Sequence, residues 1–506
     1  MTHDFTADKT LSLDACLADL CSFIRAAVAQ GLSFHDFELG TLDRLRRAGH
    51  AATQEFVAQQ GTGDLGPSVT LPGGEQVRRL PQLHTRLLSG VFGTFTLRRS
   101  CYGTREGQKI DFVPLDNRLQ LPKGKFSYLL QDFNNLLATD NPFEQVADTL
   151  KRILRLEQHV DSLERQGQHM AEHVEPFRNA QQAPPLQEEG SILVRTADAK
   201  GVPMRCAADA PSIRSHQHKR GPKTGRKKQA IVGAVYSVKP LLRQPEEIVE
   251  MLFSEPAKQK PRPKRPELGF KRVMARLNEY KDNKGTEHDG LTEVFEWLER
   301  ELDDRNPVGD QVLVNLFDGD ERFAKAKEQG SEPGGVDILD LLHVTPRLWQ
   351  AARLLAPRDN AAAEQLVRGW VLQVLRGKVE EVVADMRKQG EAAKLGGNKK
   401  KELELACNYL DKRKTQMRYH EYLAAGYPIA SGVIEGACRH YVKDRMERTG
   451  MSWKQAGAQA MLELRSVALN ETWEEFQAFY RQRQTEQLYP HRQLLDSMPW
   501  PLAQAA

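Results

Sequence analysis

Residues 430–453 read ASGVIEGACRHYVKDRMERTGMSW, and this stretch gives the strongest indication of the fold. A Ser-Gly turn leads into a helical pattern whose first turn holds Glu435. Arg439 and Lys443 follow at spacings of four, so the pattern predicts three side chains on one helix face. An acid flanked by bases suits a site that holds a metal ion and grips phosphate oxygens. Most such pairs only line a solvated helix face, so a metal site also requires matching acids elsewhere in the chain.

Upstream of this stretch, apolar strands alternate with amphipathic helices. The alternation predicts a mixed sheet covered by helices. The predicted strands are 191–197, 229–238, 311–317 and 336–344, and the clearest helix is 291–302. A helix start is predicted at Thr345-Pro346, after the last strand. Residues 360–425 read as helical, broken by a Gly/Lys loop at 394–401.

Two aspartates follow predicted strands directly, Asp198 after the first and Asp318 after the third. Together with Glu435 they would suit a site for two Mg²⁺ (or Mn²⁺) ions, on which an in-line phosphoryl displacement can run. An Asp at a strand end is also a common turn residue, so each has a purely structural alternative. The sequence does not rank the neighbouring acids, which are Asp209, Asp320, Asp337 and Asp340.

The amino-terminal third predicts a different organisation. Helical periodicity over residues 11–60 includes an apolar stripe of Leu13, Leu17, Leu20, Ile24 and Val28. A Gly/Pro-rich connection (61–82) and a strand-like hairpin (91–113) follow, and then three helices at 126–137, 141–154 and 157–170. The third helix is polar, with Gln158, Ser162, Arg165 and Gln166 as candidate DNA contacts. Such a trio fits a helix-turn-helix reader of the major groove, and equally an ordinary helical bundle.

Composition restricts the class of protein. The chain has 506 residues, of which 40% are hydrophobic and 28% are charged, and its formal net charge is +4. This length predicts several domains. No apolar run approaches the roughly 20 residues of a membrane span, and the first residues lack a signal peptide. The six cysteines are scattered without metal-binding spacing, so we expect a cytoplasmic protein without a membrane partner.

Two basic runs, 214–228 and 257–272, interrupt this balanced composition. Such runs are either solvated loops or polyanion-binding segments. In the second interpretation they would line a DNA path, with salt-sensitive and sequence-independent affinity. The candidate contacts in the first run are Lys219, Arg220, Lys223, Arg226, Lys227 and Lys228.

Four stretches together resemble the signature blocks of bacterial insertion-sequence transposases, namely VRTADAKGVPMR (194–205), LVNLFDG (313–319), DILDLLHVTPRLWQAA (337–352) and SGVIEGACRHYVKDRMERTGMSW (431–453). The narrower resemblance is to the ISKra-type group, relatives of the Mutator-like eukaryotic transposases. VPLDNRLQLP (113–122) is similar to that group's amino-terminal half. The resemblance covers most of residues 80–470, and the SGxxEG…KDRMERTGM block is its most specific part.

This resemblance implies an α/β ribonuclease-H-like catalytic domain with a large all-α insertion, preceded by a mostly α-helical DNA-binding region. It implies Asp198, Asp318 and Glu435 as the DDE catalytic and metal-binding triad. His343 matches the group's DxxH pattern, which places a histidine near the site, although a core histidine is an equal alternative. Arg439 and Lys443 would assist.

The resemblance implies seven segments. The amino-terminal part holds a helical region (1–82), a hairpin with a helix-turn-helix-like DNA-binding module (83–175) and a linker (176–190). The rest holds the first part of the catalytic core (191–357), the helical insertion (358–428), the core helix with Glu435 and the helix after it (429–475), and a tail (476–506).

The implied function is that of a transposase, which binds terminal inverted repeats, cleaves the element's ends and joins them to target DNA. We expect double-stranded DNA as partner, a homodimer or larger assembly, and a nucleoid-associated location in the bacterial cytoplasm. The alternatives are a nuclease of the same fold without strand transfer and an inactive DNA-binding descendant.

Overall fold

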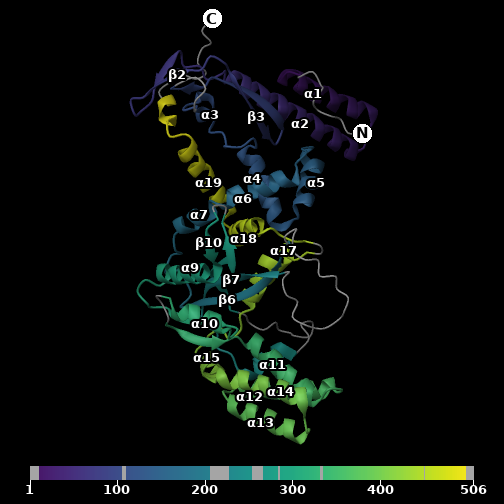
Figure 1. Cartoon of the computed structure of the whole chain (residues 1–506). Coiled ribbons are helices and arrows are strands. Elements are labelled where there is room, and N and C mark those ends of the chain that lie inside the picture. The colour runs from purple at the N-terminus through teal and green to yellow at the C-terminus, as the bar shows by residue number, and fades with distance from the viewer. Residues whose placement is uncertain are drawn as a thin grey trace, which may run out of the picture. The chain divides into compact units, whose positions relative to one another are not determined.

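The computed structural model describes residues 11–104, 110–205, 227–253, 266–282, 285–330, 334–448 and 451–496 (Figure 1). The chain forms two compact units. Unit 1 combines Met1–Gln166 with Glu474–Ala506, and unit 2 is Gly167–Trp473. Across the described ranges, no helix has the length and apolar character that a membrane crossing requires.

Unit 1 is built from helices and two small antiparallel sheets. Its elements are α1 (Leu13–Gln30), α2 (Phe34–Gln59), β1 (Ser68–Thr70), β2 (Gln76–Arg79), β3 (His84–Gly90), β4 (Gly93–Arg99), β5 (Tyr102–Gly103), α3 (Pro114–Leu119), α4 (Tyr128–Asp140), α5 (Phe143–Leu154), most of α6 (Val160–Ala171), α19 (Trp473–Leu488) and the 3₁₀ turn η3 (Arg492–Leu495). The predicted hairpin (91–113) is present as β3 and β4, so it begins at His84 and ends at Arg99.

The predicted helices over 11–60 form, but their apolar stripe is not a core. Leu17, Ile24 and Val28 on α1 are exposed, the last by 80%. Small side chains such as Cys16 and Ala48 are buried instead. A stripe of large apolar residues therefore predicts the helix correctly here without predicting which face is buried.

The helices α4, α5 and α6 lie close to their predicted positions, but the predicted reading surface is mostly turned inward. Ser162 is buried, and Gln166 accepts a hydrogen bond of 2.9 Å from the Asn134 amide of α4. Gln158 is half-buried and precedes the first turn of α6. Only Arg165 of the four predicted contacts is exposed. The prediction is wrong for Ser162, because its side chain is buried, and the Gln166 amide oxygen is already used as a hydrogen-bond acceptor between helices.

Two helix boundaries in unit 1 also differ from prediction. The side chain of Asn141 donates to the Leu137 carbonyl at the end of α4, so α5 begins only after Pro142. The predicted tail (476–506) holds most of α19 as well as η3. Within unit 1, the Tyr480 hydroxyl of α19 donates to Gln131 at 3.1 Å, so this segment is part of a packed unit.

Unit 2 contains the predicted α/β pattern. Its elements are α7 (Val174–Ala180), β6 (Ile192–Pro203), β7 (Lys227–Val238), α8 (Pro245–Phe253), β8 (Leu268–Leu277), β9 (Glu279–Lys281), β10 (Glu287–Asp289), α9 (Gly290–Arg305), β11 (Val312–Phe317), α10 (Glu321–Glu328), β12 (Val336–Leu339), α11 (Leu341–Leu355), α12 (Asn360–Leu375), α13 (Val379–Ala392), α14 (Gly397–Lys412), η1 (Lys414–Gln416), α15 (Tyr419–Ala424), α16 (Gly432–Ala437), the π turn η2 (Cys438–Lys443), α17 (Asp444–Met446) and α18 (Gln455–Leu469).

A five-stranded mixed sheet in the order β12-β11-β6-β7-β8 forms the centre of unit 2. The β12–β11–β6 ladders are parallel, and the β6–β7–β8 ladders are antiparallel. Side chains alternate between two apolar layers, because successive strand residues point to opposite faces. Val194 packs with Leu316 in the layer that includes α11 to α14, and Leu193 packs with Leu298 of α9 in the other. Figure 1 shows α11, α12, α13 and α14 grouped together.

Several predicted boundaries in unit 2 are wrong. The strand β6 does not end at Asp198 but continues to Pro203, since the long hairpin with β7 supplies partners for it. The strand β12 ends at Leu339, and α11 begins at Leu341 with Asp340 as its N-cap. Pro346 therefore lies inside α11 instead of starting a helix. The predicted loop at 394–401 is shorter, because α14 already begins at Gly397.

The sequence prediction missed β8, which overlaps the second basic run. Arg272 on this strand donates two hydrogen bonds to Glu301 of α9, at 3.0 and 3.2 Å. This part of the run is therefore used within the fold. The rest of that run up to residue 265 lies outside the described residues.

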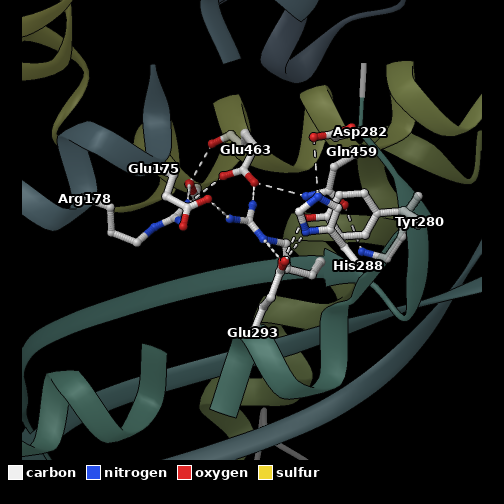
Figure 2. A network of polar contacts seen from close by, with 11 residues as sticks. Glu175, Arg178, Tyr280, Asp282, His288, Glu293, Gln459 and Glu463 are labelled. Carbon is white, nitrogen blue, oxygen red and sulfur yellow. Dashed lines mark hydrogen bonds and ion pairs between the residues drawn. The ribbon is translucent and has the colours of Figure 1, made fainter. Parts of the chain in front are cut away.

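The predicted linker (176–190) is helical only at its start and irregular from residue 181 to 190. It begins within α7, and its Glu189 is fully buried against Arg305 in a two-pronged ion pair of 2.6 and 2.9 Å. Further buried charges join three elements of unit 2. Arg178 of α7 and Arg276 of β8 both bind Glu463 of α18 (Figure 2). Long-range ion pairs of this kind cannot be deduced from sequence spacing.

Candidate active site

Three aspartates lie at matching positions on three neighbouring parallel strands: Asp318 and Asp340 directly follow β11 and β12, and Asp198 lies within β6. In the β11–β6 ladder Asn315 is opposite Arg195, and three residues further along stand Asp318 and Asp198. In the β11–β12 ladder the last pair immediately precedes Asp318 and Asp340. Matching positions on neighbouring parallel strands, about 4.8 Å apart, direct their side chains to one face. The sheet therefore assembles a row of three carboxylates, those of Asp198, Asp318 and Asp340, which we call the acid row.

Glu435 of α16 lies beside this row. Its carboxylate, the Asp340 carboxylate and the His343 imidazole offer ligand atoms that all lie within 4.8 Å of one another. These three residues could hold a metal ion. Of the predicted triad only Glu435 belongs to this group, while Asp198 and Asp318 interact with it electrostatically.

Asp340 orients the surrounding side chains. Its carboxylate accepts hydrogen bonds from the Ser431 hydroxyl and from the Leu342 backbone N–H at 2.9 Å. His343 Nδ1 lies 3.4 Å from Asp340 Oδ2. With Nδ1–H directed at that oxygen, Nε2 keeps the lone pair that a metal ion needs. His343 lies in the first turn of α11 and not on a strand as predicted, and this position brings it to the site.

The charges of the site perturb one another. Burial is the main cause that raises the pKa of Asp318, and the Asp198 charge adds to it, while the Asp320 backbone N–H and His343 oppose it. Partial desolvation of its carboxylate and then the Asp340 charge raise the pKa of Glu435, although the residue as a whole is exposed. Burial and like charges hold the protons of these carboxylates more tightly than usual, and the positive charges nearby offset this only in part. A divalent cation would supply further positive charge, so the residues present fit such an ion.

The hydrogen bond with Asp340 is the largest cause that raises the pKa of His343, and the charges of Asp318 and Asp198 act in the same direction. Burial opposes them. The negative charges of Asp198, Asp318 and the buried Asp340 therefore all favour the protonated imidazole. The charges of β6 and β11 thus act on a side chain of the first turn of α11.

The predicted face of Glu435, Arg439 and Lys443 does not form. The π turn η2 begins at Cys438 and changes the helical spacing, so positions four apart no longer align. Arg439 is exposed and its Nε lies 4.0 Å from Asp444, and Lys443 is also exposed. The buried Arg465 stabilises the π turn, because its guanidinium donates to the carbonyls of residues 440 and 441.

Sequence reasoning missed two further residues of the site. Lys200 stands two residues after Asp198 on β6, so its side chain shares that face, and its charge lowers the pKa of Glu435. The Cys438 thiol is buried and donates a hydrogen bond to Asp198. Burial is the main cause that raises the pKa of this thiol, and Asp198 adds to it. The i,i+2 spacing on a strand could have indicated Lys200, whereas nothing in the sequence indicates Cys438.

The helices between β12 and Glu435 hold the loop that carries Asp318. The Tyr409 hydroxyl of α14 donates to the Asp318 carbonyl at 2.9 Å, and Arg413 donates to the Gly319 carbonyl at 2.6 Å. Gly319 has a φ of +82°, a left-handed conformation that glycine adopts without strain. Asp320 caps α10 and its carboxylate is bound by Arg322, so it does not belong to the row.

The predicted DNA contacts of unit 2 are only partly placed. Lys227 forms an ion pair with Glu447, and Lys228 Nζ lies 3.5 Å from the Gln455 amide oxygen, so both lysines have partners within the fold. The other predicted contacts in this run lie outside the described residues: Lys219, Arg220, Lys223 and Arg226.

Comparison with known proteins adds no assignment, since no family model and no curated protein matches this chain.

We predict that Asp340, His343 and Glu435 bind a divalent metal ion directly. We expect His343→Ala to weaken Mn²⁺ binding at least about tenfold in calorimetric titrations, because the imidazole supplies one of three converging donors. His420→Ala is the matched control, since His420 lies on α15 and is half-exposed. Equal Mn²⁺ affinity in both variants would show that His343 is not a ligand.

Proposed function

We propose that this chain is a DDE transposase that binds the terminal inverted repeats of an insertion sequence, cleaves the phosphodiesters at its ends and joins the freed 3′-hydroxyls to target DNA. The observation that carries the proposal is that aspartates of β6, β11 and β12 lie at matching positions of the sheet, where Asp340 meets Glu435 from a distant helix. The resemblance of the same stretches to insertion-sequence transposases supports it. A ribonuclease-H-like arrangement of the sheet is part of this proposal.

Bound at these carboxylates, divalent cations would activate water and neutralise charge on the phosphate and the leaving oxygen. The residues of the chain prepare the site for this chemistry. Asp340, held by Ser431 and the start of α11, fixes the orientation of His343. Lys200 brings a positive charge beside Glu435, where it can attract a phosphate oxygen.

The transposase proposal also implies partners. Both element ends must be processed together, so we propose a homodimer or a larger assembly on double-stranded DNA. Arg165 on α6 is the predicted recognition residue that is exposed, and it is available for DNA contact.

The decisive experiment uses DNA that carries the sequences flanking this reading frame. We expect Mg²⁺-dependent nicking at the ends of inverted repeats, followed by joining of the labelled 3′ end to a target plasmid. Cleavage without joining would favour the nuclease alternative. Specific binding of the ends without any cleavage, in Mg²⁺ or Mn²⁺, would favour an inactive DNA-binding descendant.

A further inference from the structure

An exposed arginine lies one helical turn beyond His343 on α11. The Arg347 guanidinium lies 4.8 Å from the ring centroid of Tyr409. Within the described ranges it makes no hydrogen bond or ion pair, in contrast to Arg322 and Arg387, which bind carboxylates. A guanidinium that stacks on a ring keeps the N–H groups of its plane available for oxygen acceptors.

The ring beneath Arg347 is fixed to the backbone of the active site. The Tyr409 hydroxyl donates to the Asp318 carbonyl at 2.9 Å, and a second guanidinium, that of Arg413, lies 4.4 Å from the same ring centroid. Arg413 also donates to the Gly319 carbonyl. The position of Arg347 is thus coupled, through one aromatic ring, to the loop that carries Asp318.

The positive charges around the Tyr409 ring favour an anionic ligand. Two guanidinium groups lie beside Tyr409, and only Arg413 of the two has a hydrogen-bond acceptor among the described residues. Burial is the main cause that raises the pKa of the Tyr409 hydroxyl, and the negative charges of Asp318 and Asp340 act in the same direction. An anion at Arg347 would therefore lie next to the acid row but outside it. A planar guanidinium matches two oxygens of a phosphate group.

We propose that Arg347 binds a backbone phosphate of the nucleic-acid strand that crosses the acid row, next to the phosphodiester that is cut. The helices α11 and α14 thereby form a phosphate-binding position, with Tyr409 as its platform. Arg347 and Lys200 would hold the strand at two points, one from the helices and one from β6. This inference rests on the proposed function for the identity of its ligand.

The test compares Arg347→Ala with Arg353→Ala. Arg353 is a matched control because it is exposed on the same helix and also stacks on an aromatic ring, with its guanidinium 5.3 Å from the centroid of Trp349. Binding of a short fluorescent DNA duplex is measured against salt concentration in the Glu435→Gln background, so that the DNA stays intact. We expect Arg347→Ala to weaken binding about five- to tenfold and to reduce the salt slope by about one phosphate contact.

Two further variants examine the geometry. Arg347→Lys keeps the charge but loses the planar fork, so it should restore only part of the affinity. Tyr409→Leu should weaken binding in the wild-type chain and have little additional effect in Arg347→Ala, since the two changes remove one contact. Unchanged thermal unfolding of Arg347→Ala verifies that folding is intact.

The outcomes separate the two proposals. If Arg347→Ala binds DNA with the affinity and salt slope of Arg353→Ala, the phosphate contact is refuted. If Arg347→Ala binds weakly while wild type neither cuts nor joins DNA, the contact stands and the transposase assignment fails.

Discussion

Glu435→Gln should lower Mg²⁺-dependent cleavage and strand transfer together, by at least about a thousandfold. The substitution keeps the size of the side chain but removes the charge that would offset bound cations. Glu435 lies within 4.8 Å of donor atoms of Asp340 and His343, so a neutral amide there should also weaken metal binding. DNA binding and folding should persist, because the residue is exposed.

The measurement is cleavage and joining of a labelled end substrate, with DNA binding and thermal unfolding recorded on the same preparations. Glu391→Gln is the control, since Glu391 is exposed on α13. If Glu435→Gln cut and joined DNA at the wild-type rate, Glu435 would be a surface acid and the DDE interpretation would lose its third member.

Glu463→Ala should have the largest effect on stability, lowering the free energy of unfolding of unit 2 by about 3–5 kcal/mol. Glu463 is buried on α18 and binds both Arg178, at 2.7 Å, and Arg276. Its removal leaves two buried guanidinium groups with less compensating charge. The same carboxylate accepts a 3.0 Å hydrogen bond from Gln459 (Figure 2), which is lost as well.

Urea unfolding provides the test, with probes that report on unit 2. The control is Glu364→Ala, which removes an exposed i,i+4 pair with Arg368 and should cost no more than about 1 kcal/mol. Equal losses in the two variants would mean that the network around Glu463 contributes no more than a surface ion pair.

Local patterns predicted the elements of the fold well. Short apolar runs and helical periodicity identified the strands β6, β7 and β11 and the helix α9, because both patterns report the burial of nearby residues. Predictions failed where distant partners decide. The strand β6 extends past Asp198 only because β7 pairs with it, and Gln166 turns inward only because Asn134 meets it.

The candidate site shows the same division. The sequence by itself determined that Asp318 follows a strand and that Glu435 begins a helix, but it placed Asp198 at a strand end although β6 continues past it. Only the tertiary structure decided which groups meet. The sheet order and register make Asp340 the third aspartate of the row, and its cap of α11 brings His343 to the site.

The environment of Glu435 was likewise decided in three dimensions. The π turn η2, whose carbonyls Arg465 binds, removes Arg439 from the predicted face, while the strand β6 brings Lys200 close instead. Sequence spacing fixes the direction of a side chain within one helix or strand. It carries no information on which strand lies beside which, because register and sheet order follow from packing between residues that are far apart in the chain.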